Sequence, residues 1–214
     1  MIVLAVRWYL RFGLSYRDLE ELLTERGVEV DHVTVYRWVL RFTPLMAEAA
    51  RPCRHRVGDR WQVDETYVKV AGQWRDVYRA IDQFAQIIDV FVSSRRDTKA
   101  AHRFFERAIG TTKIAPAGGH HRSGAGVPGR AGGPAAGGPA PHRPVRQQPD
   151  RVRPREAEST AAPDARPQTG PSARVIIAGH AFVQNLRRGH YELAVDESAG
   201  RRLAVAFDEL AMTV

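Results

Sequence analysis

The middle of the chain restricts the possible folds more than any other part. Residues 116–171 hold eleven of the 13 prolines and contain no Leu, Ile, Phe, Tyr, Trp, Met or Lys. Such a segment cannot bury enough apolar surface to offset the lost chain entropy, so we predict that it is disordered. A structureless segment of this length is unusual inside one compact domain. The periodic patterns on either side must therefore supply the folded structure.

Charge and cysteine content narrow the class of protein. Lys and Arg number 32 against 24 Asp and Glu, a formal net charge of +8. This excess favours a polyanionic partner such as DNA or an anionic membrane surface, although a basic protein without such a partner fits equally well. Cys53 is alone, which excludes an intrachain disulfide or a thiolate zinc site and suits a reducing cytoplasm. The apolar start, Met1–Val6, is too short for a membrane span, so we expect a cytoplasmic protein without a membrane anchor.

The first part of the chain predicts a helix-turn-helix. An apolar helix is expected over 4–12, and Ser15 with Asp18 marks the start of a second helix that ends at Gly27. Asp31 or Thr34 can cap a third helix. Its apolar positions should face inward (Val35, Trp38, Val39, Phe42) and its polar positions outward (Thr34, Arg37, Arg41). In a helix-turn-helix these outward residues would contact phosphates or base edges in a major groove, although an ordinary helical hairpin with a solvated basic face has the same pattern.

The next part predicts an antiparallel three-strand meander. Strands are expected at 61–70, 74–82 and 87–93, with a tight turn at Gly72-Gln73. A helix capped by Thr98 should follow, with an apolar face of Ala101, Phe104, Phe105 and Ile109. Asp64 lies in the middle of the first strand, where a lone carboxylate must be paired or bound to a metal. Its neighbour Glu65 should point to the other face of the sheet.

Several motifs in this order resemble the insertion-sequence family six transposases. They are Asp64-Glu-Thr-Tyr-Val-Lys-Val70, Gly72-Gln-Trp-Arg75, Tyr78-Arg-Ala-Ile-Asp82 and Arg95-Arg-Asp-Thr-Lys-Ala-Ala101. The stretch 14–23, the Val35-Tyr-Arg-Trp-Val39 helix and the tail from Ser172 to Phe182 are also similar to that family. The resemblance covers residues 1–115 and 172–214.

This resemblance implies an α/β fold with an RNase H-like core and an Asp-Asp-Glu triad. Such a triad holds two divalent ions, Mg²⁺ or Mn²⁺, and supports cleavage and joining of DNA strands at terminal inverted repeats and target DNA. Asp64 matches the first aspartate, and would be both catalytic residue and metal ligand. Family members also act as multimers on DNA, so a homo-oligomer is an expected partner. The family's second aspartate and its glutamate are not visible in residues 116–171.

The genetic code offers an explanation for the two missing carboxylates. Reading the codons that encode Gly118 to Pro128 one base later permits Val-Thr-Thr-Asp, with the aspartate across Arg122 and Ser123. The same shift over residues 142–156 permits Asn-Asn-Arg-Ile-Glu, with the glutamate across Arg151 and Val152. We therefore hypothesise one frameshift near residues 115–117 and a compensating one near Pro171. An arginine at either position cannot ligate a cation.

Four regions follow: a helix-turn-helix over 1–56, the first half of the core over 57–115, a frameshifted disordered segment over 116–171, and a C-terminal helix and tail over 172–214. The fourth core strand and the next helix should be lost, leaving the core incomplete and its sheet edge exposed. We expect a transposase that is catalytically inactive in this copy. The alternatives are a DNA-binding remnant, which either acts as a repressor or has no function, and an unrelated helix-turn-helix regulator.

Overall fold

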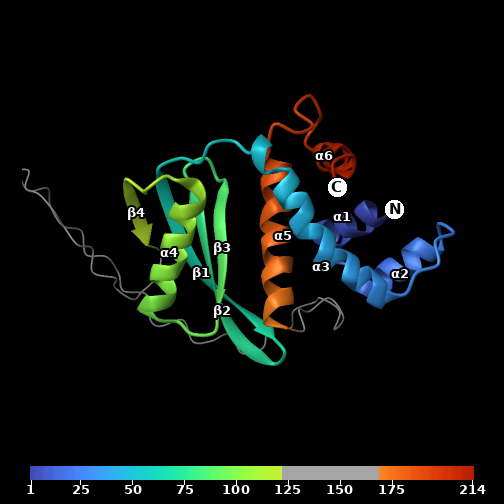
Figure 1. Cartoon of the computed structure of the whole chain (residues 1–214), viewed down its shortest axis with the longest axis horizontal. Coiled ribbons are helices and arrows are strands. Elements are labelled where there is room, and N and C mark those ends of the chain that lie inside the picture. Colours follow the sequence, from blue (N-terminus) through green and yellow to red (C-terminus); the bar gives the residue numbers. More distant parts are fainter. Residues whose placement is uncertain (122–168) are drawn as a thin grey trace, which may run out of the picture.

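The computed structural model describes residues 1–121 and 169–214. Most of the segment predicted to be disordered, with the positions Arg122 and Arg151, lies outside these residues. The prediction is wrong for its described ends, because residues 118–121 form a strand and a helix begins at Gly170. In the part described, an N-terminal group of helices is followed by a sheet with a helix on it, and two further helices close the chain. The two helical segments at the ends of the chain lie together on one side of the sheet (Figure 1).

The N-terminal helices are α1 (Ile2–Phe12), α2 (Tyr16–Thr24) and α3 (His32–Ala49), followed by the short 3-10 helix η1 (Arg51–Cys53). The predicted start of α2 is confirmed as a capping box, because the Ser15 hydroxyl accepts the Asp18 N–H and the Asp18 carboxylate accepts the Ser15 N–H. Of the two candidates for the cap of α3, Asp31 is the residue that caps it.

The sheet contains β1 (Arg60–Val70), β2 (Gln73–Asp82), β3 (Ile87–Ser93) and β4 (Gly118–His121), in the order β3-β2-β1-β4. The first three strands form the predicted antiparallel meander. The expectation that the fourth strand is lost is wrong, because residues 118–121 pair with β1 in parallel. They have no bulky apolar side chain, so strand periodicity does not reveal them.

The turn between β1 and β2 is one residue earlier than predicted. Ala71 and Gly72 form it, with φ angles of 48° and 78°, and Gln73 already belongs to β2. Two positive φ angles make a hairpin turn whose twist matches that of the strands. Gly72 is thus the second residue of the turn, not the first. This changes the β1–β2 register by two residues, so that Val70 pairs with Gln73.

Helix α4 (Thr98–Thr112) covers one face of the sheet (Figure 1). Asp97 rather than Thr98 caps it, by accepting the Ala100 N–H. Phe104 is fully buried and its ring stacks on Tyr78 of β2, 5.9 Å away between centroids. The predicted face is confirmed for Ala101 and Phe104, whereas Phe105 and Ile109 are only partly buried at its margin.

Helices α5 (Gly170–Arg188) and α6 (Arg202–Ala211) pack against α1 and α3 and complete a second core. The α5–α3–α1 contact is close, since a Cβ atom placed on Gly179 would lie 2.6 Å from the Thr43 side chain and 2.8 Å from that of Leu10. Helix α5 lies alongside β3 at one edge of the sheet (Figure 1). We call α1–α3, α5 and α6 the helical region, and β1–β4 with α4 the sheet region.

One buried amide joins the two regions. The side chain of Asn185 on α5 accepts the Ile87 N–H and donates to the Ile87 carbonyl of β3, both at 2.8 Å. It thus satisfies backbone groups at the side of β3 where, among the described residues, no other strand pairs. The resulting α/β arrangement agrees with the expected partial RNase H-like core. In the part of the chain described, no helix is long and apolar enough to cross a membrane.

Candidate functional site

Asp64 lies in the middle of β1, on the sheet face opposite α4. Its neighbours Trp61 and Val63 are buried in the core beneath α4, and alternation along the strand turns Asp64 away from that core. The carboxylate is about half-exposed, at 43%. The predicted alternation is confirmed by Glu65, whose carboxylate lies on the α4 side and pairs with Arg96 at 2.8 Å.

Arg79 holds the Asp64 carboxylate from the neighbouring strand. The two residues are directly opposite each other in the β1–β2 register. The Arg79 Nε–H and Nη2–H groups donate to the two carboxylate oxygens, at 3.1 and 2.5 Å. This bidentate hydrogen bond from Arg79 to Asp64 raises the pKa of the guanidinium. Asp64 is therefore paired, one of the two states that its place in the strand predicts.

The donor set around Asp64 does not fit a two-metal site. Both of its oxygens already accept from a cation, and a cation repels a metal ion. Among residues 1–121 and 169–214, no three His, Cys, Asp or Glu side chains come together in a way that could hold a metal ion. Asp82, the next acid in the motif, is buried and accepts the N–H groups of Gly58, Phe84 and Gln86, so it organises a turn.

Sequence reasoning missed Arg79 because the predicted turn shifted the pairing. Across a two-residue turn at Ala71-Gly72, residue 64 lies opposite residue 79, whereas a turn at Gly72-Gln73 brings residue 81 there. The short strand β4 runs beside β1 on the side of Asp64 away from β2. Its last residue, His121, pairs with Val63, so β4 ends one residue short of the level of Asp64.

The predicted DNA-binding residues lie on α3. Arg37 and Arg41 are exposed, while Val35 and Val39 on the opposite side of the helix are fully buried. The Arg41 guanidinium lies 5.9 Å from the centroid of the Phe42 ring. Thr34 differs from both arginines, because it is half-buried and its hydroxyl donates to the Asp31 carboxylate at 2.8 Å. Arg37 and Arg41 are thus displayed together, one helical turn apart.

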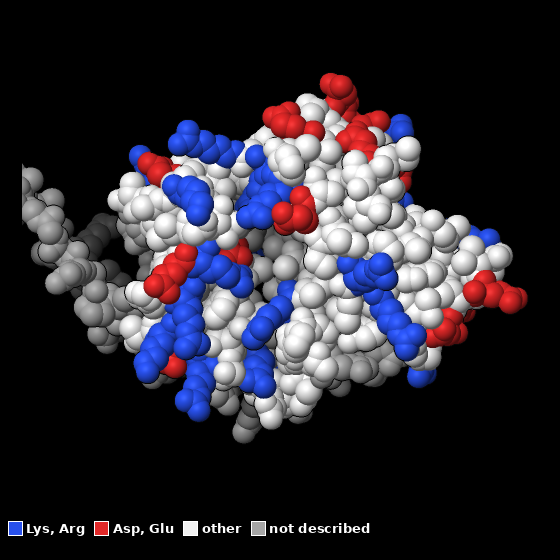
Figure 2. Space-filling model, viewed as in Figure 1, with Lys and Arg blue, Asp and Glu red and all other residues white. Residues whose placement is uncertain are grey.

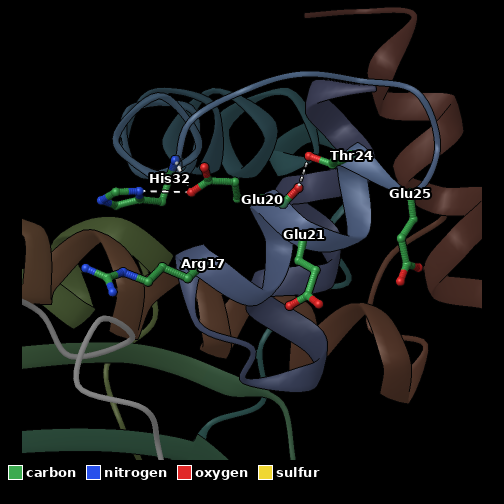
Figure 3. Close-up of a pocket in the computed structure, with 6 residues that line it drawn as sticks. All are labelled: Arg17, Glu20, Glu21, Thr24, Glu25 and His32. Carbon is green, nitrogen blue, oxygen red and sulfur yellow. Dashed lines mark hydrogen bonds and ion pairs between the residues drawn. The ribbon is translucent and has the colours of Figure 1, made fainter.

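An acidic surface lies beside the start of α3 (Figure 3). Glu20 of α2 reaches toward His32, accepting its backbone N–H at 3.0 Å and lying 2.9 Å from its Nδ1 atom. Glu21 and Glu25 point away from His32 and line the outer side of the same shallow hollow with Arg17 and Thr24 (Figure 3). Glu20 was not foreseen, and it joins the α2 helix to the first residue of α3. The carboxylates give this surface a negative charge, in contrast to the side of α3 that carries Arg37 and Arg41.

Comparison with known proteins supports the resemblance found in the motifs. A family model described as a DDE domain matches residues 58–118. The transposase for insertion sequence-like element IS431mec of Staphylococcus aureus (strain Mu50 / ATCC 700699) is 42% identical over 109 residues, 51% of this chain and 49% of that protein. The transposase for insertion sequence element IS257 in transposon Tn4003 of Staphylococcus aureus is 41% identical over 109 residues, which are 51% of this chain and 49% of that protein.

A third relative is the uncharacterized protein pYV0051 of Yersinia pseudotuberculosis serotype I (strain IP32953). It is 35% identical over 54 residues, 25% of this chain and 50% of that protein. The chain thus spans about half the length of the curated relatives that it matches. The DDE domain implies use of divalent metal ions in the family. The part of the chain that these comparisons cover is therefore similar to insertion-sequence transposases, and residues 58–118 match a DDE domain.

Proposed function

We propose that this chain binds DNA through α3 and does not cleave or join DNA strands. The observation that carries the first half is the exposed pair Arg37 and Arg41, held outward by the burial of Val35 and Val39. Guanidinium groups one turn apart on a helix suit phosphate oxygens and guanine edges in a major groove. The proposed partners are the terminal inverted repeats and target DNA, bound by one chain or by a homo-oligomer. The chain would act as a repressor of its own element.

A gel shift on the flanking terminal inverted repeats tests DNA binding, at two salt concentrations and against a scrambled duplex. Neutralising two phosphate contacts in Arg37→Gln/Arg41→Gln should reduce the slope of log K against log salt by about 1.8. If the arginines contact bases, the preference for the repeats should fall by about 1–3 kcal/mol for each contact. Sequence-independent binding that disappears at moderate salt in the wild-type protein would contradict the proposal.

The second half of the proposal rests on the carboxylates of the described residues. Asp64 is the member of the triad that they supply, and Arg79 occupies both of its oxygens. A second carboxylate on a neighbouring element is needed before two cations can be held close together. We expect purified protein to show no Mg²⁺- or Mn²⁺-dependent cleavage or strand transfer on its own terminal repeats. Detectable strand transfer would overturn this expectation.

The frameshift hypothesis gains support from the position of β4. In the shifted reading frame the aspartate codon follows directly after the codons for residues 118–121, and β4 ends one residue before the level of Asp64. Neighbouring strands lie about 4.8 Å apart, so a chain with the restored frame would place a second carboxylate beside the first. Sequencing the gene tests the hypothesis. Stop codons in the shifted frame, or the absence of the Thr-Thr-Asp and Asn-Asn-Xaa-Xaa-Glu motifs, would refute it.

A further inference from the structure

Three cations lie close together in the sheet region, away from α3. Arg95 in the loop after β3, and Lys99 and Arg103 on α4, are all exposed. They line a hollow at the end of β3 together with Ser93, Ser94, Asp97 and Ala100. Lys and Arg side chains gather over the part of the surface where α4 lies (Figure 2). We call Arg95, Lys99 and Arg103 the α4 cation cluster.

The backbone around the cluster is fixed by local hydrogen bonds. The Ser93 hydroxyl donates to the Arg95 carbonyl at 2.8 Å and accepts the Arg95 N–H at 3.2 Å. Asp97 is the acid in the lining, and its carboxylate accepts the Ala100 N–H at 2.7 Å as the cap of α4. Lys99 and Arg103 are one turn apart, a rise of about 6 Å along the helix. The three side chains therefore project from a defined surface.

The position of the cluster decides what it can bind. Like charges held together repel one another, and a polyanion with regularly spaced charges relieves that repulsion at several points at once. The cluster belongs to the sheet region, whereas Arg37 and Arg41 belong to the helical region, so a long duplex could contact both surfaces. The formal net charge of +8 favours such a partner over the whole chain.

We propose that the α4 cation cluster is a second DNA-contact surface, which binds the phosphate backbone of double-stranded DNA independently of sequence. This inference rests on the proposed DNA binding by α3. In this arrangement α3 selects the sequence, while the cluster adds affinity that depends strongly on salt. The two surfaces should therefore fail in different ways when each is neutralised.

The experiment measures binding of the full chain to a labelled duplex by fluorescence anisotropy over a series of salt concentrations. The test variant is Arg95→Gln/Lys99→Gln/Arg103→Gln. Its matched control, Arg51→Gln/Arg187→Gln/Arg201→Gln, removes the same charge from exposed positions elsewhere. Loss of about three phosphate contacts should lower the salt slope by about 2–3 and weaken binding by tenfold or more at low salt. The preference for terminal repeats over a scrambled duplex should stay unchanged, and circular dichroism should show the same helix content for both variants.

The possible outcomes separate this inference from the proposed function. Equal loss in the test and control variants would mean that only net charge matters, and would overturn the inference while leaving binding through α3 intact. If the Arg37→Gln/Arg41→Gln variant loses its sequence preference while the test variant binds DNA with unchanged affinity and salt slope, the inference is also overturned and binding through α3 is retained. A test variant that binds DNA normally but no longer binds phosphatidylserine vesicles would assign the cluster to membranes instead. A wild-type chain that binds no DNA would overturn both proposals.

Discussion

The helical region and the sheet region depend on different kinds of interaction. The helical region is held by a large apolar core in which α5 and α6, from the end of the chain, pack on α1–α3. The sheet region also has an apolar core beneath α4, but its open face carries Asp64 and Arg79, both partly exposed. Packing has many small contributors, each of which can be replaced by a residue of similar volume. A two-metal site needs particular carboxylates at particular places, so losing one removes the function while the fold remains.

The largest expected effect comes from breaking the buried Asn185–Ile87 contact between the two regions. Asn185→Leu removes both hydrogen bonds to Ile87 and leaves its buried N–H without an acceptor. The free energy of unfolding should fall by about 3 kcal/mol, measured by urea denaturation. Gln184→Leu, one residue earlier on α5, is the control and should change it little. Equal stability of the Asn185 variant and wild type would show that the regions do not depend on this contact.

A matched pair of glycines compares the packing of the two regions. Gly179→Ala adds a methyl group that would lie 2.6 Å from the Thr43 side chain and 2.8 Å from that of Leu10, so these side chains or the helices must shift. We expect a loss of about 2 kcal/mol. Gly110→Ala on α4 meets no atom within 4 Å and should stabilise the protein by about 0.5–1 kcal/mol through reduced chain entropy. Thermal unfolding of both variants measures the contrast, and a destabilised Gly110 variant would contradict it.

The Asp64–Arg79 pair should contribute less, because it is partly exposed to solvent. A double-mutant cycle with Asp64→Asn and Arg79→Gln should give a coupling energy of about 0.5–1 kcal/mol at low salt. High salt should reduce this value by screening. A coupling energy of zero would mean that Arg79 does not hold the carboxylate in solution.

The smallest expected effect is a dependence on pH in the helical region. His180 of α5 is largely buried, its Nδ1 atom lies 3.0 Å from the Leu10 carbonyl, and its burial lowers its pKa below the usual 6.5. The unfolded chain therefore takes up a proton first as the pH falls below 6.5, and the free energy of unfolding decreases until the folded pKa is passed. Above 6.5 His180 contributes no such dependence. His180→Gln should flatten this decrease in urea titrations carried out at a series of pH values below 6.5.

Local patterns predicted most of the secondary structure. The Ser15–Asp18 capping box, the three strands of the meander and the buried Phe104 all follow from signals within a few residues. The hairpin turn was displaced, because a glycine indicates a positive φ angle without saying which place in the turn it takes. Ala71 holds the other place with a φ of 48°, which a residue with a Cβ atom rarely adopts. This displacement of the turn by one residue is the reason why the sequence did not indicate Arg79 as the partner of Asp64.

Long-range contacts were harder to predict. Helix α6 was not foreseen, although Leu203, Ala206, Phe207 and Leu210 have helical spacing and are all buried. Nothing near Asn185 in the sequence indicates that its amide meets Ile87, since the two residues are 98 positions apart. Asp64 itself was identified only through the surrounding motif, because a carboxylate within a strand is compatible with an ion pair or a metal ligand.

The contact between Leu10 and His180 also has a consequence for how the protein is made. These residues are 170 positions apart, so α1 emerges from the ribosome long before α5 can cover it. Domains generally fold as units and the N-terminal part is synthesised first, at about 5–20 residues per second. At this rate the apolar sides of α1 and α3 stay uncovered for roughly ten seconds or more before α5 is synthesised, and during that time they are accessible to chaperones and proteases. A chain interrupted before α5 would leave α3 without part of the apolar core on which it packs, so an early stop codon would damage the helical region more than an altered middle segment would.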